Sequence, residues 1–540
     1  MTEWTIGEVI DAIADVIPDR PMTVCGERVS TFGAVADRTR RLANFLVQNG
    51  FGAHHERAAL NNWECGQDRV ALVMHNDLYP DAVIGCLKAR TVPVNVNYHY
   101  TPREVSELLD YVKPRAVVYH RSLGAKFADV LPPMSADLLI SVDDGSDAPL
   151  LAGATTLADA LAAGDADQDV SPSPDDLLMI CTGGTTGRPK GVMWRQGDIY
   201  VSSMNGGDHL AVEEIHDKVR HAGPPWFAVS PLMHAAGMWT AFSAVLSGQT
   251  TVLYDTKSKF DPRTVLETAE RHGVGLMTMV GDAYAAPLVE ELGRRSYDLS
   301  SLFAIGTGGA ATNPKHQAAL LEYMPQITII NGYGSSETGN MGFGRSQRGD
   351  QKETFELRTG GLVLSADYTR FLEPGDAEIG WVARNGRIPL GYYDDAEATR
   401  KTFPEVQGQR VVISGDRASI ESDGTLRLLG RDSLVVNTGG EKVFVEEVEE
   451  VLRAHPDIVD ALVVGRPSER WGQEVVALIA LRDGAVLVHD LLHTHCTQQL
   501  ARFKAPKEFI VVAQVRRLGN GKADYRWAKS QAIEHAPLAR

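Results

Sequence analysis

The chain has 540 residues, of which 44% are hydrophobic and 23% are charged, and its formal net charge at pH 7 is -17. This length predicts at least two domains, at roughly 100 to 200 residues each, and the composition is typical of a folded α/β protein. The acidic balance argues against a nucleic-acid partner, because phosphate backbones are held by clustered Lys and Arg.

Five scattered cysteines, with no CxxC pair among them, argue against a disulfide framework or a zinc module and favour a reducing compartment. The N-terminal stretch lacks the basic and long apolar regions of a secretion signal. No window approaches about 18 uninterrupted apolar residues, the length that a membrane helix needs. We therefore expect a cytoplasmic protein without a membrane span, whereas peripheral membrane contact and a homodimer stay open.

The first third of the chain alternates helical patterns with short apolar runs. Residues 40–47 predict a helix, and residues 70–74 and 117–119 predict strands. Such alternation favours βαβ units and a parallel sheet. Residues 164–176 have no apolar period and contain two prolines, so we expect an exposed loop there.

The stretch CTGGTTGRPKG, residues 181–191, directly follows a run of four apolar residues, 177–180, that predicts a buried strand. Ligands bind at the carboxyl ends of strands in open α/β sheets. Glycines let backbone N–H groups turn toward one concavity, and the threonine hydroxyls and Lys190 add donors and a charge, so the loop suits a polyphosphate. It is not a Walker A loop, since Gly191 stands where Ser or Thr would follow the lysine. A plain surface turn is the alternative.

Two further strand-and-glycine patterns follow. Residues 301–311 contain Gly306-Thr307-Gly308-Gly309-Ala310-Ala311, which also fits a GxGxxA dinucleotide fingerprint. That fingerprint needs an acid at the end of the next strand, but the next strand is expected to end in Asn331. Residues 327–338 place a Gly-rich turn and a carboxylate, Glu337, after an apolar strand, and Thr338 excludes the Gly-x-Ser-x-Gly nucleophile elbow.

After about residue 430 the pattern predicts a separate small α+β domain. We expect helices near residues 446–455 and 491–503 and strands at 459–464, 475–481 and 509–512. Residues 430–434 spell GRDSL, the attachment motif of phosphopantetheine carriers. A carrier serine opens a helix, whereas here a β-like run leads into a Gly-Gly turn, so we reject that interpretation.

The order of residues 181–191 closely resembles the phosphate-binding loop of the acyl-adenylate-forming family, which includes acyl-CoA synthetases, luciferases and the adenylation domains of peptide synthetases. Gly183 departs from the family's usual serine. The resemblance extends from residue 5 to residue 529. It implies an α/β fold with a large N-terminal domain of layered α/β subdomains, residues 1–432, and a small mobile C-terminal α+β domain, residues 433–540.

The resemblance also implies the nucleotide site. Tyr333 would stack on adenine, Glu337 would hold Mg²⁺, Asp416 would accept from the ribose hydroxyls, and Arg431 would reach ribose and phosphate. ATP and AMP binding is assigned to Thr182, Gly183, Gly184, Thr185, Thr186, Gly187, Lys190, Gly308, Gly309, Ala310, Asn331, Gly332, Tyr333, Gly334, Ser335, Ser336, Asp416, Arg431 and Lys522.

Catalytic roles fall on Lys522, Glu337 and His234 by the same resemblance, although the proline that usually precedes the lysine motif is missing. Ser433, where the family commonly has Asp or Lys, would be the hinge between the domains. Gly439 and Gly440 would approach CoA. The acyl pocket would draw on Trp226, Trp239, Gly281 and Ala283.

The expected activity is that of an ATP-dependent acyl-CoA ligase, with ATP, Mg²⁺, CoA and a small-molecule carboxylic acid bound. Residues 94–98, 437–443 and 521–529 resemble actinobacterial fatty-acyl and steroid-side-chain CoA ligases, which implies a long-chain or steroidal acid. Three alternatives stay open: an enzyme that stops at acyl-AMP and passes the acyl group to a carrier protein, a catalytically silent nucleotide sensor and, more remotely, a dehydrogenase.

Overall fold

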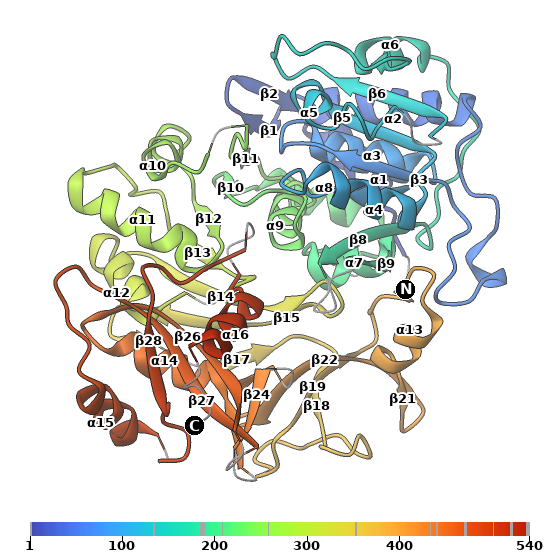
Figure 1. Ribbon diagram of the computed structural model, residues 1–540. Helices are drawn as coiled ribbons and strands as arrows, with labels where there is room; N and C mark the ends of the chain where they lie inside the picture. Colours follow the sequence, from blue (N-terminus) through green and yellow to red (C-terminus); the bar gives the residue numbers. More distant parts are fainter. Residues whose placement is uncertain are drawn as a thin grey trace.

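The computed structural model describes residues 3–132, 136–183, 189–207, 209–257, 259–310, 312–351, 354–431, 434–438, 441–468, 472–500, 502–518 and 522–535. Three sheets organise the chain: two large ones in the N-terminal part and a smaller one near the C-terminus. Figure 1 shows helices layered against the sheets, and the small C-terminal part lies beside the second large sheet.

The first large sheet has the strand order β20-β9-β8-β4-β3-β5-β6-β7. From β8 to β7 all pairs are parallel, and β9 and β20 add antiparallel strands at one edge. Its strands are buried on both faces, as expected where helices cover a parallel sheet. The strands are β3 Arg69–Val73, β4 Val92–Asn95, β5 Ala116–His120, β6 Leu138–Val142, β7 Thr155–Thr156, β8 Leu177–Gly183, β9 Pro189–Arg195 and β20 Gly391–Tyr392; the helices are α1 Ile6–Val16, α2 Phe32–Gln48, α3 Tyr79–Lys88, α4 Pro102–Val112, α5 Arg121–Lys126 and α6 Leu157–Ala163, and a 3₁₀ turn spans Arg57–Ala59.

The second large sheet joins a parallel half to an antiparallel half, in the order β18-β19-β22-β23-β17-β15-β14-β13-β12-β10-β11-β1-β2. The change of direction occurs between β14 and β15. The strands are β1 Pro21–Cys25, β2 Arg28–Thr31, β10 Trp226–Ala228, β11 Thr251–Leu253, β12 Leu276–Met279, β13 Ala304–Thr307, β14 Thr328–Ser335, β15 Gly339–Gln347, β16 Asp350–Gln351, β17 Thr354–Leu357, β18 Gly361–Leu364, β19 Gly380–Asn385, β21 Glu405–Val406, β22 Gln409–Ile420 and β23 Leu426–Arg431; the helices are α7 Gln196–Ser203, α8 Val212–Arg220, α9 Ala235–Val245, α10 Pro262–Arg271, α11 Gly281–Arg294, α12 Pro314–Tyr323 and α13 Ala396–Thr402.

The small C-terminal part has its own sheet and two apolar clusters, one on each face. Its elements are β24 Val435–Thr438, β25 Glu441–Phe444, α14 Val445–Ala454, β26 Ile458–Ser468, β27 Gly472–Leu481, α15 His489–Gln499, β28 Glu508–Val511 and α16 Tyr525–Glu534. This confirms the α+β composition expected from the sequence. The β24–β25 hairpin also confirms the β-like run that argued against a carrier serine.

The predicted elements at residues 40–47, 117–119 and 177–180 are confirmed as parts of α2, β5 and β8, and the strand predicted at 70–74 is confirmed as β3, which ends at Val73. Two predictions need correction. β14 does not turn at its glycines but continues to Ser335, because it pairs antiparallel with β15 and the turn comes only at residues 336–338. α15 ends at Gln499 rather than near residue 503, and α16 was not predicted.

Candidate active site

The described ends of the expected phosphate loop, residues 181–183 and 189–191, pair in β8 and β9 at the carboxyl edge of the first sheet. Thr182 lies opposite Lys190, and Gly183 lies opposite Pro189. The strand before it is buried, as predicted, with Leu177 to Ile180 all 2% exposed or less. The predicted binding residues Gly184, Thr185, Thr186 and Gly187 lie outside the described residues.

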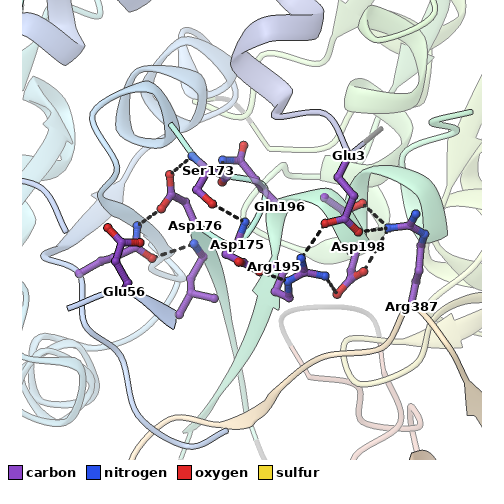
Figure 2. A network of polar contacts seen from close by, with 12 residues as sticks. Glu3, Glu56, Ser173, Asp175, Asp176, Arg195, Gln196, Asp198 and Arg387 are labelled. Atoms are coloured by element: carbon purple, nitrogen blue, oxygen red, sulfur yellow. Dashed lines mark hydrogen bonds and ion pairs between the residues drawn. The ribbon is translucent and has the colours of Figure 1, made fainter. Parts of the chain in front are cut away.

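A network of charged side chains fixes the base of this hairpin (Figure 2). Arg195, the last residue of β9, donates to Glu3 (2.7 Å) and Asp198 (3.1 Å) and also contacts Asp175. Arg387, which follows β19, reaches the same two acids, Glu3 (3.1 Å) and Asp198 (3.3 Å). These ion pairs tie the N-terminal segment and the second sheet to the end of the hairpin at Arg195. The opposite end of the hairpin, at Gly183 and Pro189, lies toward the site.

Glu337 lies in the turn between β14 and β15, and side chains from three other elements hold that turn. Trp194 of β9 donates through Nε1 to the Ser336 carbonyl (2.8 Å). Arg384 of β19 donates through Nη1 to the Thr338 carbonyl (2.8 Å). The Oη of Tyr392, in β20, donates to Oε1 of Glu337 (3.0 Å). The carboxylate is therefore oriented from both large sheets.

Glycine is required at two positions of the β14–β15 hairpin. At Gly334 a Cβ would lie 2.2 Å from the Gly339 carbonyl oxygen, and at Gly339, where φ is +67°, it would lie 2.6 Å from the Ser203 hydroxyl. Arg384 is 4% exposed, and burial lowers the pKa of its guanidinium to about 10, with the charge of Arg358 acting in the same direction. Arg384 therefore donates to a carbonyl group of the turn between β14 and β15. A side chain at Gly334 or Gly339 would disrupt this turn.

Tyr392 also contacts the phosphate hairpin. The Lys190 ammonium lies 4.6 Å from the centroid of the Tyr392 ring, within the range of a cation–π contact. Burial, and then the neighbouring Glu337, raise the pKa of the Tyr392 phenol, so the hydroxyl stays a donor. One side chain thus touches the phosphate-site lysine and the expected metal carboxylate. The sequence gives no sign of these contacts, because a tyrosine after a glycine is not a recognisable motif.

The residues expected to bind adenine and ribose lie on the second sheet. Tyr333 Oη donates to Oδ2 of Asp416 (2.6 Å), which is 7% exposed and pairs in register with Arg431 across β22 and β23. The side chain of Arg431 lies outside the described residues. Asn331 donates to Gln317 and Ser346 (both 3.4 Å). Two of the predicted ribose and adenine residues therefore contact each other directly.

Small residues follow β13 at the point where its backbone closely approaches that of β14. A Cβ on Gly308 would lie 3.3 Å from the Gly332 carbonyl oxygen, and Gly309 has φ +78°. Ala310 follows in the same bend. The next helix, α12, begins only at Pro314. A dinucleotide fingerprint would open a helix at the glycines, so the structure does not support the dehydrogenase alternative.

His234 precedes the first residue of α9 and is half-buried. Burial, and then the charges of Lys522 and His99, together lower the pKa of its imidazole to about 4. Lys522 comes from the small C-terminal part, and the segment between β28 and α16 extends toward α9 in Figure 1. A contact between the two parts joins Lys315 Nζ of α12 to the Ile458 carbonyl of β26 (3.5 Å). The charge of Lys522 thus acts on the His234 imidazole across the two parts.

Residues 10–370 match the AMP-binding enzyme family, and residues 447–522 match the AMP-binding enzyme C-terminal domain. The chain belongs to the AMP-binding enzyme family. The expected α/β fold with a large N-terminal and a small C-terminal domain is confirmed. The exact boundary at residue 432 stays a prediction.

Relatives of this AMP-binding enzyme match it along almost its whole length. It is 41% identical to the medium-chain acyl-CoA ligase Mig of Mycobacterium avium, over 98% of this chain and 99% of that protein. It is 37% identical to a medium/long-chain-fatty-acid–CoA/3-oxocholest-4-en-26-oate–CoA ligase of Mycobacterium tuberculosis H37Rv, over 97% and 96%. It is 34% identical to 3-oxocholest-4-en-26-oate–CoA ligase of Rhodococcus rhodochrous, over 97% and 95%.

Solved structures share the fold at lower identity. The o-succinylbenzoate CoA synthetase MenE of Bacillus subtilis, solved with an acyl-adenylate intermediate, is 21% identical with a TM-score of 0.75, over 100% of this chain and 99% of that one. The amide bond synthetase McbA of Marinactinospora thermotolerans is 21% identical with a TM-score of 0.80, over 98% and 100%. The AMP-binding fold therefore extends through both domains.

The predicted acyl-pocket residues are not all brought together. Trp239 lies on α9, and Gly281 and Ala283 lie in the first turn of α11, directly after the carboxyl end of β12. Trp226 is instead the first residue of β10, in register with Leu276. Leu276 in turn pairs with Ala304, four residues before Gly308, so at about 3.3 Å per residue Trp226 lies about 13 Å below the edge that carries Gly308. The structure therefore does not bring Trp226 to the site.

Other predicted residues of this AMP-binding enzyme stay untested. The hinge Ser433 and the CoA-binding Gly439 and Gly440 lie outside the described residues. Within the described ranges, no group of three His, Cys, Asp or Glu is arranged to hold a metal ion. Glu337 is a single carboxylate, which fits Mg²⁺, since that ion keeps several waters and takes phosphate oxygens alongside one or two carboxylates. No helix in the described part is both long and apolar enough to cross a bilayer.

Proposed function

We propose that this AMP-binding enzyme is an ATP-dependent acyl-CoA ligase that forms acyl-CoA, AMP and pyrophosphate through an acyl adenylate. The observation that carries the proposal is the convergence of the β8–β9 hairpin, Glu337, the Tyr333–Asp416 pair and His234, whose pKa the Lys522 charge lowers, at the carboxyl edges of the two large sheets. Names of relatives that cover the whole chain support a fatty or steroid-side-chain acid as the substrate.

In the first half-reaction, a carboxylate oxygen of the acid attacks the α-phosphorus of ATP, and the bond to the pyrophosphate oxygen breaks. The hairpin that carries Thr182 and Lys190 would hold the β- and γ-phosphates, and Asp416 would hold the ribose. Lys522 would stabilise the two anions as they approach each other. When bound, Mg²⁺ would neutralise charge on the phosphates, and Glu337, oriented by Tyr392, is the residue that would hold it.

In the second half-reaction, the CoA thiol loses its proton, its sulfur attacks the acyl carbon, and AMP leaves with the carboxylate oxygen. We propose that the small domain turns about Ser433 between the two steps. That rotation would withdraw Lys522 and bring Gly439 and Gly440 to the same place. The effect of the Lys522 charge on the pKa of His234 supports the first arrangement.

The acyl group would lie against the start of α9, where Trp239 and the first turn of α11 remain the proposed lining. The Nε1 of Trp239 is buried without a hydrogen-bond partner. We place the protein in the cytoplasm, a proposal supported by its five free cysteines, of which four are buried.

The test is a panel of medium-chain, long-chain and steroidal acids, each incubated with ATP, Mg²⁺ and free CoA while AMP and thioester are measured. We expect AMP to form only when both an acid and ATP are present, and a stoichiometric thioester when CoA is added. AMP formation without CoA thioester would favour the enzyme that transfers to a carrier protein. ATP binding without acid-dependent pyrophosphate release would favour the nucleotide sensor.

Replacing Tyr392 by phenylalanine should slow adenylation about tenfold, because a hydrogen bond to a charged group contributes roughly 1.5 to 3 kcal/mol. The ring that packs against Lys190 is kept, whereas the Oη contacts with Glu337 and Thr402 are lost. Acid-dependent ATP–pyrophosphate exchange measures the effect. Tyr393→Phe is the matched control, and equal rates for the two variants would contradict the assigned role.

His234 should stay uncharged throughout the working pH range. Because folding lowers its pKa from 6.5 to about 4, the unfolded chain binds the extra proton first, and His234 favours the folded state less as pH falls from 6.5 toward 4. We therefore expect the ratio of kcat/KM between wild type and His234→Asn to be constant from pH 5.5 to 9. An inflection in this ratio between pH 6 and 7 would show that His234 titrates with the pKa of an ordinary histidine, which would contradict this expectation.

A further inference from the structure

The side chain of Asn95, the last residue of β4, joins two segments of the site that are far apart in the sequence. Its Oδ1 accepts from the backbone N–H of Cys181 (2.7 Å), and its Nδ2 donates to the Cys181 carbonyl (3.0 Å). The same Nδ2 donates to the Met233 carbonyl (2.7 Å). Cys181 directly precedes Thr182 of the phosphate hairpin, and Met233 directly precedes His234.

These contacts take the place of backbone hydrogen bonds between β4 and β8, which are no longer paired at this point. β4 and β8 are paired in register only at Val94 and Met179. Beyond that pair the strands separate, and the Asn95 amide fills the gap by mimicking a peptide group toward Cys181. Its second donor then extends the connection to Met233. Asn95, Met233 and Ala235 line one narrow cavity beside β8, so the amide spans space that no backbone fills.

The far end of the His234 segment is also held by an asparagine amide. Asn76, which is 1% exposed, accepts from the backbone N–H of Leu232 (2.7 Å) and donates to the Tyr254 carbonyl (3.0 Å). Asn76, which follows β3 of the first sheet, therefore holds the segment to both large sheets. Asn95 connects it to the strand that leads into the β8–β9 hairpin.

We propose that Asn95 is a positioning residue that sets the distance between the phosphate hairpin and the His234 segment. The inference rests on the proposed function, in which the first segment holds the ATP phosphates and the second lies beside the acid. The amide touches neither substrate. It acts by keeping the carboxylate and the α-phosphate in reacting geometry, and a misplacement of about 1 Å costs on the order of a hundredfold in rate.

A positioning role predicts which kinetic constant changes. In Asn95→Ala each substrate should still find its own segment, so KM for ATP and KM for the acid should stay within about threefold. The kcat of acid-dependent ATP–pyrophosphate exchange should fall between about tenfold and a hundredfold. Thioester formation from supplied acyl adenylate should be unchanged within about threefold, because the bond between acid and phosphate already exists.

The experiment measures both half-reactions and the thermal midpoint for wild type, Asn95→Ala, Asn95→Asp and Asn97→Ala. Asn97 is the matched control, a half-buried asparagine two residues further on whose Oδ1 accepts from the His99 backbone N–H (2.9 Å). Asn95→Asp keeps the shape and the acceptor for Cys181 but loses both donors, so it tests the proposal if the alanine variant does not fold. It should lose exchange at least as strongly as the alanine variant.

Three results would overturn the proposal: exchange in both Asn95 variants equal to that of Asn97→Ala, a loss confined to KM with kcat unchanged, or equal losses in the two half-reactions. The last would show that Asn95 supports the large domain as a whole. If wild type itself forms no AMP from any acid, the proposed function fails instead, so the two failures are distinguishable.

Discussion

Replacing Lys522 by alanine should slow acid-dependent ATP–pyrophosphate exchange about a thousandfold and leave thioester formation from supplied acyl adenylate within about threefold. Two unit charges about 4 Å apart interact by ~4 kcal/mol at an effective dielectric near 20, which corresponds to roughly a thousandfold in rate. The acid and the α-phosphate repel each other only while the first bond forms, so the benefit of the ammonium group belongs to that step.

The control for this experiment is Lys529→Ala, which removes the same charge from an exposed position of α16, in the same domain. It should leave both half-reactions unchanged. Equal losses of both half-reactions in Lys522→Ala would contradict the account, since a lysine that merely supports the small domain would affect both. Rapid-quench measurement of each half-reaction separates these outcomes.

Replacing Glu337 by glutamine should lower the adenylation rate by a hundredfold or more, the size of effect seen when one group that stabilises transition-state charge is removed. Glutamine keeps the volume and an oxygen that can accept from Tyr392, so the turn held by Trp194 and Arg384 should persist. Only the negative charge offered to Mg²⁺ is lost.

Calorimetric titration of ATP with and without Mg²⁺ gives a readout that does not depend on turnover. In Glu337→Gln we expect the binding of ATP alone to be unchanged and the gain in affinity from Mg²⁺ to be reduced. Glu356→Gln, on the neighbouring strand β17 and exposed, is the control. If Mg²⁺ strengthened ATP binding equally in wild type and in Glu337→Gln, the metal role of Glu337 would be wrong.

The parts of the site that the sequence could predict are those in which the signal is local. The apolar run before CTGGTTGRPKG is short, buried and followed at once by glycines, so strand and loop were both recognisable. The helices and strands of the small domain were equally predictable, because they alternate within about a hundred residues. Its last helix, α16, was missed, since it has few buried apolar positions.

The residues that orient the site could not be predicted, because their partners lie far away in the chain. Tyr392 contacts Glu337 across 55 positions, Trp194 reaches Ser336 across 142, and Asn95 reaches Met233 across 138. None of these residue types is unusual in a core. Their roles appear only when the two large sheets are placed side by side.

Two errors had different physical causes. A Gly-rich stretch normally predicts a turn, but the glycines at 332 and 334 lie inside β14, where the close approach of β15 at Gly334 excludes a side chain. Trp226 was expected in the acyl pocket from the family resemblance. A strand of three residues gives no indication of which end faces the site, and the register placed Trp226 at the far end.

The most direct test is a crystal structure of this protein with a non-hydrolysable acyl-adenylate analogue, such as an acyl-sulfamoyl adenosine. The account predicts adenine against Tyr333, the ribose hydroxyls on Asp416, and the acyl-sulfamate linkage between His234 and Lys522. An adenosine bound away from both Glu337 and Asp416 would contradict it.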